Sequence, residues 1–330
     1  MKRINLKSHR NLIFVAAAIV VYAFIAYGMN SNLLPRATQT LAIKACYNVI
    51  LALSLSLIVG FLGELSLGHA GFFALGAYSG CIFSINSNLP IELRFVLAAL
   101  IGGTVAAIGG FLISSSILRL QGDYLAIVTL AFGEIIRSFI KIIPVTGGTA
   151  GLGGIPSLGS KLKTFTFSYV FVILTILVIR NIVASSHGRA ITSIRDNAIA
   201  AESIGINIKL YKIKVFTVGA FFAGIAGVIL GHYINFIEPA NFNYNVSIEI
   251  LVMVVLGGMG NLLGSIIAAV VITFLPEILR GFDQYRLLIY ALALIFMMLA
   301  SNSPRIINFR VKAREKAAGL YKKLFTRKEE

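Results

Sequence analysis

The chain has 330 residues, of which 58% are hydrophobic and only 13% are charged, and its net charge is +16. Soluble globular domains carry about 45–50% apolar and about 25% charged residues, so this chain has too little polar surface for a water-soluble fold. The composition predicts an integral membrane protein whose main solvent is a lipid bilayer. Basic residues cluster at 1–10, 180–214 and 301–330, which is typical of cytoplasmic loops and argues against a nucleic-acid partner.

Apolar stretches long enough to cross about 30 Å of hydrocarbon recur along the chain. Each is expected to be a helix, because backbone polar groups in lipid must be satisfied within their own segment. The sequence predicts an all-α polytopic bundle of about ten transmembrane helices with both termini cytoplasmic. The predicted crossings are 12–28, 43–62, 71–87, 95–117, 124–143, 166–183, 213–234, 247–260, 263–279 and 286–301.

This assignment places a membrane domain at 1–301, with a long inner loop at 184–212, and a basic cytoplasmic tail at 302–330. The eighth and ninth crossings are short and interrupted by glycines. If both are half-spans of a re-entrant hairpin, the count falls to eight and both termini stay inside.

A glycine-rich segment, 66–78, places His69 between Gly68 and Gly71. Glycines let helix backbones approach closely in membranes, so tight packing is one interpretation. A broken helix that lines a transport pathway is the alternative, because freed backbone groups can meet a polar substrate.

Two charged residues, Glu134 and Arg137, fall within the fifth crossing. They are three positions apart and can pair on one helix face. Charges inside a membrane are costly and usually face the protein interior or a water-filled cavity. The pair is therefore either structural or part of a pathway.

The 184–212 loop contains an amphipathic pattern. Apolar residues recur at three- and four-residue steps, at Ile191, Ile194, Ala198, Ala201 and Ile204. We predict one short helix that Ser185 or Ser186 caps and that Gly205 ends in the left-handed conformation. It would either lie on lipid headgroups or serve as a docking element for a partner.

Catalytic and nucleotide-binding signatures are missing from the sequence. In the 257–264 stretch, which includes Gly257 and Gly258, the third glycine falls one place too late for a dinucleotide fingerprint, and no Walker A pattern occurs. The four histidines are scattered, and Cys46 and Cys81 lie inside apolar runs. We expect no enzyme activity, no metal and no cofactor in this chain, and we do not expect it to bind or hydrolyse ATP by itself.

Five segments resemble, in order, the permease subunits of branched-chain amino-acid ABC importers of the LivM type: 66–78, 120–130, 146–156, 194–207 and 248–260. In that family the inner loop is a coupling helix that docks on an ATPase. The resemblance implies an ATPase contact at Ala200, Ala201, Glu202 and Gly205, flanked by Arg195 and Asp196. Ala198 departs from the pattern, because related loops often carry an acid there.

The resemblance also implies a second homologous permease subunit, two ATP-binding subunits and an extracytoplasmic binding protein, all at a bacterial inner membrane. The expected cargo is leucine, isoleucine or valine. Candidate pathway residues are Gly68, His69, Gly71, Glu134, Gly257 and Gly258. The alternatives are a urea- or amide-type permease of the same family and an ion-coupled secondary transporter that uses Glu134.

Overall fold

The computed structural model describes residues 20–278, apart from 32, 34, 118, 119 and 121, together with 291, 292 and 295. Its contacts divide the chain into two units, Met1–Phe274 and Leu275–Glu330. The second unit is described only at 275–278 and at 291, 292 and 295, all of which are helical. The predicted last crossing is therefore described only at those three residues, and the basic tail lies outside the described residues.

The first unit is built from helices, and its described residues contain no strand, only an isolated bridge between Leu152 and Ile237. An apolar helix, Val20–Asn30, precedes the labelled elements. These are α2 (Arg36–Leu55), the π-helix η1 (Ser56–Leu62), α3 (His69–Asn86), α4 (Ile91–Ser116), α5 (Asp123–Ile142), η2 (Pro144–Thr146), η3 (Gly148–Ala150), α6 (Lys161–Ala184), α7 (Ser186–Asp196), α8 (Ala198–Ser203), α9 (Ile208–Ile234), η4 (Pro239–Phe242), α10 (Tyr244–Gly257) and α11 (Leu262–Ile278).

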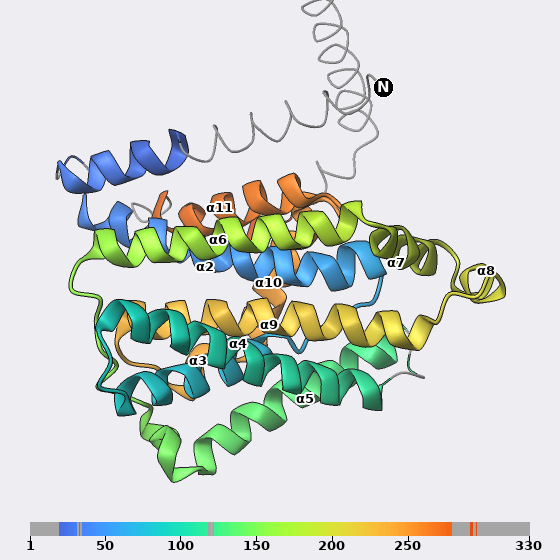
Figure 1. Ribbon diagram of the computed structural model, residues 1–330, viewed down its shortest axis with the longest axis horizontal. Helices are drawn as coiled ribbons and strands as arrows, with labels where there is room; N and C mark the ends of the chain where they lie inside the picture. Colours follow the sequence, from blue (N-terminus) through green and yellow to red (C-terminus); the bar gives the residue numbers. More distant parts are fainter. Residues whose placement is uncertain are drawn as a thin grey trace, which may run out of the picture. The chain divides into compact units, whose positions relative to one another are not determined.

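Four of these helices are long and apolar enough to cross a membrane: α2 with η1, α4, α6 and α9. They run side by side along a common direction, as Figure 1 shows. Together with α3 and α5 they coincide with six predicted crossings to within about two turns. The prediction of an all-helical, multi-span membrane protein is therefore confirmed.

The centre of the first unit is α2, whose apolar window is entirely buried. Beside it, α3, α4 and α9 pack on one another through glycines. A Cβ added to Gly102 on α4 would lie 2.6 Å from the carbonyl oxygen of Gly76 on α3, and a Cβ added to Gly224 on α9 would lie 2.6 Å from that of Gly102. Small residues thus let three helix backbones meet directly.

The helical winding changes directly after α2. The next seven residues form η1, a π-helix, which is a rare structure that often occurs at functional sites. Gly63 ends η1 with a left-handed φ of 80°, a conformation that glycine adopts without steric cost. The chain then runs without helix to His69, where α3 begins.

A short hairpin joins α10 and α11. Gly258 and Gly260 make its turn with positive φ angles of 89° and 78°, and α11 follows at Leu262. The 14 residues of α10 span about 21 Å, less than the hydrocarbon thickness. The predicted glycine interruption is therefore present, and α10 is too short to cross a bilayer at full thickness.

Candidate functional site

The 184–212 segment lies beyond one end of α6 and α9 and contains α7 and α8 (Figure 1). Ser185 caps α7 by accepting a hydrogen bond from the backbone of Gly188, and Gly205 takes a φ of 86° after α8. The predicted cap and the predicted left-handed glycine are both confirmed. We call the end of the first unit that carries this segment the α7 end.

The prediction of one continuous helix in this segment is wrong. At Asn197 the backbone is extended, with φ −159° and ψ 103°, and its side chain accepts a hydrogen bond from Ala200 N at 3.0 Å. Asparagine favours this N-cap position because its side chain satisfies a free backbone donor. A second helix, α8, therefore starts where the periodic pattern predicted that the first would continue.

The break also changes which residues are buried. Of the residues on the predicted apolar face, Ile191, Ile194 and Ala201 are buried, but Ile204 is 76% exposed. Ile199, on the opposite side of the predicted stripe, is 80% exposed. The tip around α8 therefore presents two large apolar side chains to its surroundings.

The six residues that the resemblance assigned to an ATPase contact separate into two groups. Ala200, Glu202 and Gly205 are exposed on the tip, whereas Ala201 is buried beneath it. Arg195 and Asp196 lie at the end of α7, where the Arg195 guanidinium donates a hydrogen bond to the carbonyl oxygen of Gly60 in η1.

A buried ion pair lies near the same end of the first unit. Lys212, at the start of α9, pairs with Glu64, which follows η1, and their side chains are only 7% and 12% exposed. The sequence analysis did not single out this pair. The available signal was a lone acid between two long apolar runs, but its partner lies 148 positions away and no local pattern identifies it.

The predicted ion pair on α5 is confirmed. Arg137 Nη1 lies 3.4 Å from both carboxylate oxygens of Glu134. Most of α5 is not covered by the rest of the chain, since only Leu125, Ala126, Thr129 and Ile140 are buried. The two charged side chains, 33% and 24% exposed, lie near the middle of this poorly covered helix.

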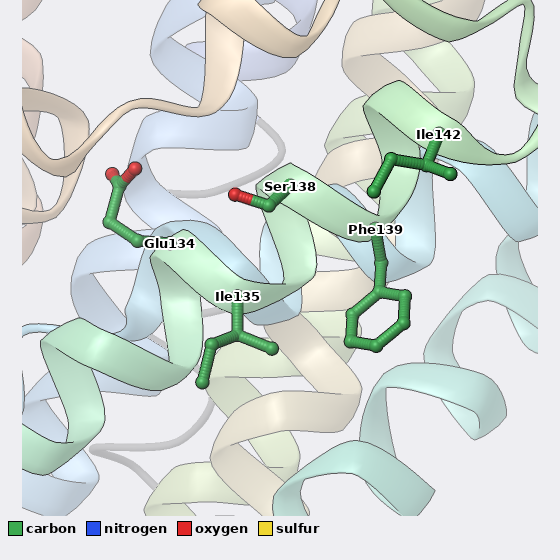
Figure 2. Close-up of a pocket in the computed structure, with 5 residues that line it drawn as sticks. All are labelled: Glu134, Ile135, Ser138, Phe139 and Ile142. Atoms are coloured by element: carbon green, nitrogen blue, oxygen red, sulfur yellow. The ribbon is translucent and has the colours of Figure 1, made fainter.

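An open pocket lies along the same helix. Glu134, Ile135, Ser138, Phe139 and Ile142 line it, and Figure 2 shows that all five side chains come from α5. The carboxylate of Glu134 and the hydroxyl of Ser138 thus lie beside apolar side chains, and α5 alone lines the pocket.

Two glycines of the 66–78 segment, Gly68 and Gly71, pack against α5. A Cβ on Gly71 would lie 2.8 Å from Gly133 Cα, and one on Gly68 would lie 2.8 Å from the Thr129 carbonyl carbon. His69 is fully buried, with Nε2 2.7 Å from Ser54 Oγ. These contacts favour the packing interpretation, and in this conformation they place His69 away from any open surface.

Gly257 and Gly258 form part of the α10–α11 hairpin. A Cβ on Gly257 would lie 2.5 Å from the Gly264 carbonyl carbon, so the two helix ends touch through their backbones. Within the described part of the chain, no group of three or more His, Cys, Asp or Glu residues is arranged to hold a metal ion.

Comparison with known proteins defines the class. The family described as "Branched-chain amino acid transport system / permease component" matches residues 37–301, and the chain belongs to that family. No solved structure matches the chain.

Individual relatives point to one branch of it. The chain is 34% identical to the high-affinity branched-chain amino acid transport system permease protein LivM of Escherichia coli, over 80% of this chain and 68% of the relative. It is 32% identical to LivM of Salmonella typhimurium, over 87% and 73%. The ribose import permease RbsC of Haemophilus influenzae is 27% identical, over 77% and 81%. These relatives are membrane permeases and not enzymes.

Proposed function

We propose that this chain is one permease subunit of a bacterial inner-membrane ABC importer for branched-chain amino acids. Two separate ATP-binding subunits drive it, a second homologous permease completes the pathway, and an extracytoplasmic binding protein delivers the cargo. Family membership supports a permease role, and the two LivM relatives favour leucine, isoleucine or valine. Both termini are then cytoplasmic, on the same side as α7 and α8, and the tail at 302–330 is cytoplasmic too.

The exposed tip of α8 is the observation that carries the ATPase part of the proposal. Ile199 and Ile204 are each at least three-quarters exposed, and Glu202 and Gly205 are exposed between and beside them. An apolar patch with one acid suits a groove on a partner that has an apolar floor and a basic rim. We assign this tip, with Ala200, to the ATPase contact.

The α5 helix supports the pathway part of the proposal. An ion pair that is a quarter to a third exposed in the middle of a span is costly against lipid but favourable beside water or another polar surface. The open pocket beside it is lined by α5 alone. We place this face of α5, with Glu134, along the translocation pathway and opposite the second permease subunit.

The combined variant Glu202→Gln, Gly205→Ala tests the docking assignment. We expect it to insert normally and to lose most ATP-driven uptake in proteoliposomes that contain the complete transporter. The control is Gly159→Ala, because Gly159 has the same φ of 86° and the same free space around it but lies in the 143–160 loop, away from the α7 end. Normal uptake by the combined variant would refute the docking assignment.

Substrate and energy source are tested separately. Uptake is measured with leucine, urea and ribose in competition. Preference for leucine supports the proposed cargo, preference for urea supports the urea-type alternative, and preference for ribose supports the sugar cargo in the name of the ribose relative. Collapse of the proton gradient at constant ATP should leave uptake nearly unchanged. If uptake stops, an ion-coupled carrier that uses Glu134 replaces the proposal.

A further inference from the structure

Arg195 connects three segments that are far apart in the sequence. Its Nη1 donates a hydrogen bond to the Gly60 carbonyl oxygen at 3.1 Å, while Nε and Nη2 donate to Asp196 Oδ1 at 3.0 and 2.8 Å. Asp196 thus holds one edge of the guanidinium, and the opposite edge points at η1. The same Nη1 atom would lie 3.2 Å from a Cβ on Gly260 in the α10–α11 hairpin.

The Gly60 carbonyl needs such a partner because it lies in the last turn of η1. The final carbonyls of a helix lack N–H donors within it and carry its partial negative charge. The Ile58 carbonyl is used by the backbones of Gly63 and Glu64. A guanidinium at the Gly60 carbonyl therefore makes a charge-assisted hydrogen bond at the end of the helix where a cation is favoured.

Three glycines make this approach possible. A Cβ on Gly60 would lie 2.6 Å from Gly260 N, and a Cβ on Gly63 would lie 2.5 Å from Arg195 Cγ. Any larger residue at these positions would separate η1 from the hairpin or push Arg195 away. The end of α7, the end of η1 and the α10–α11 hairpin thus form one closely packed junction.

We propose that Arg195 is a positioning residue that links movement of the α8 tip to η1 and the α10–α11 hairpin. This inference rests on the proposed function. An ATPase that displaces the tip moves α7, and Arg195 carries that displacement to Gly60 and to the hairpin at Gly260. The segment's other end is held by the Lys212–Glu64 pair, and Glu64 lies just after η1. Arg195 therefore acts inside the permease, whereas Glu202 acts at the ATPase surface.

The test uses the complete transporter in proteoliposomes, with uptake and ATP hydrolysis measured together. For Arg195→Gln we expect ATP hydrolysis to continue and uptake per ATP to fall about tenfold, the factor that corresponds to losing one charge-assisted hydrogen bond. Arg195→Lys should recover part of the loss, because an ammonium can still donate to the Gly60 carbonyl but cannot hold Asp196 with two donors.

The matched control is Arg189→Gln, which removes one cation from the same helix. Arg189 is exposed, and the described part of the chain supplies no side-chain partner for it. We expect its uptake per ATP to equal that of the unaltered protein. An equal loss in both variants would mean that net charge matters and not the junction, and it would overturn the proposal.

A distance measurement reports the link directly. Spin labels at Ser186→Cys on α7 and Leu263→Cys on α11 use exposed positions outside the proposed ATPase contact, while the native Cys46 and Cys81 are buried. With Arg195 in place the distance should stay constant between the nucleotide-free and ATP-bound forms. In Arg195→Gln it should become nucleotide-dependent.

The outcomes separate the two proposals. Constant distance and unchanged uptake per ATP in Arg195→Gln would overturn the role of Arg195 and leave the importer intact. Absence of ATP-driven uptake in the unaltered complex would instead overturn the proposed function. If Arg195→Gln fails to insert, the same two measurements on Arg195→Lys decide, and values equal to those of the unaltered protein overturn the link.

Discussion

Removal of one member of the buried Lys212–Glu64 pair should destabilise the protein strongly. The substitution Lys212→Met keeps the side-chain length but leaves the Glu64 carboxylate, only 12% exposed, without its cation. Breaking a buried ion pair costs about 3–5 kcal/mol, against about 0–1 kcal/mol for an exposed pair. At about 2 °C per kcal/mol for a large chain, the midpoint of thermal unfolding should fall by about 6–10 °C.

The double variant Glu64→Gln, Lys212→Met distinguishes the pair from general damage. It removes both charges, so no buried charge is left uncompensated, and its loss should be smaller than that of Lys212→Met alone. The assay is the fraction of protein that stays monodisperse after heating in detergent, measured by size-exclusion chromatography.

A second ion pair in the same chain serves as the control. Lys163 Nζ lies 2.9 Å from Glu92 Oε1, and the two side chains are 57% and 45% exposed. This pair lies where α6 and α4 begin, at the end of α6 that is far from α7. Lys163→Met should cost no more than about 1 kcal/mol. Equal losses of stability in Lys163→Met and Lys212→Met would refute the argument that burial makes the Lys212–Glu64 pair important for stability. Simple additivity of the two single losses in Glu64→Gln, Lys212→Met would refute it as well.

Three further predictions concern the glycine packing, the α8 cap and the α5 ion pair. Gly76→Ala places a methyl group against the α9 backbone and should lower the free energy of unfolding by about 1–3 kcal/mol, measured by heating in detergent. Gly133→Ala should be tolerated, because the nearest atom to its added methyl group would be 3.6 Å away. Asn197→Ala removes the α8 cap and should cost about 1 kcal/mol of local helix stability, seen as faster amide exchange in α8; unchanged exchange would contradict this. Glu134→Gln should slow uptake without affecting insertion, and normal uptake would remove α5 from the pathway.

The sequence was sufficient for features that depend on one segment at a time. Span positions follow from apolar length, and the Glu134–Arg137 contact follows from helical spacing. The Ser185 cap and the left-handed Gly205 follow from residue type alone. In each case the physical cause lies within a few residues of the feature.

Features that depend on distant segments were not predictable in this way. The break at Asn197 is a local exception: the periodic pattern at 191–204 suits one helix, but the Asn197 side chain caps a second helix through the backbone N–H three residues on. The family resemblance placed Arg195 beside the ATPase contact. Its contact with Gly60 requires η1 and the hairpin to be brought together, which no local pattern in the chain reports.

The exposed isoleucines at the α8 tip determine how this subunit behaves when it is alone. Ile199 and Ile204 expose their apolar side chains to water, and full burial of such a side chain is favourable by about 1.5–3 kcal/mol of free energy. When the subunit is produced without a partner for this tip, the tip is an exposed apolar patch, outside the apolar spans, that favours association. Purification of the isolated subunit should show self-association that Ile199→Ser together with Ile204→Ser relieves, and co-expression with a matching partner should improve its yield.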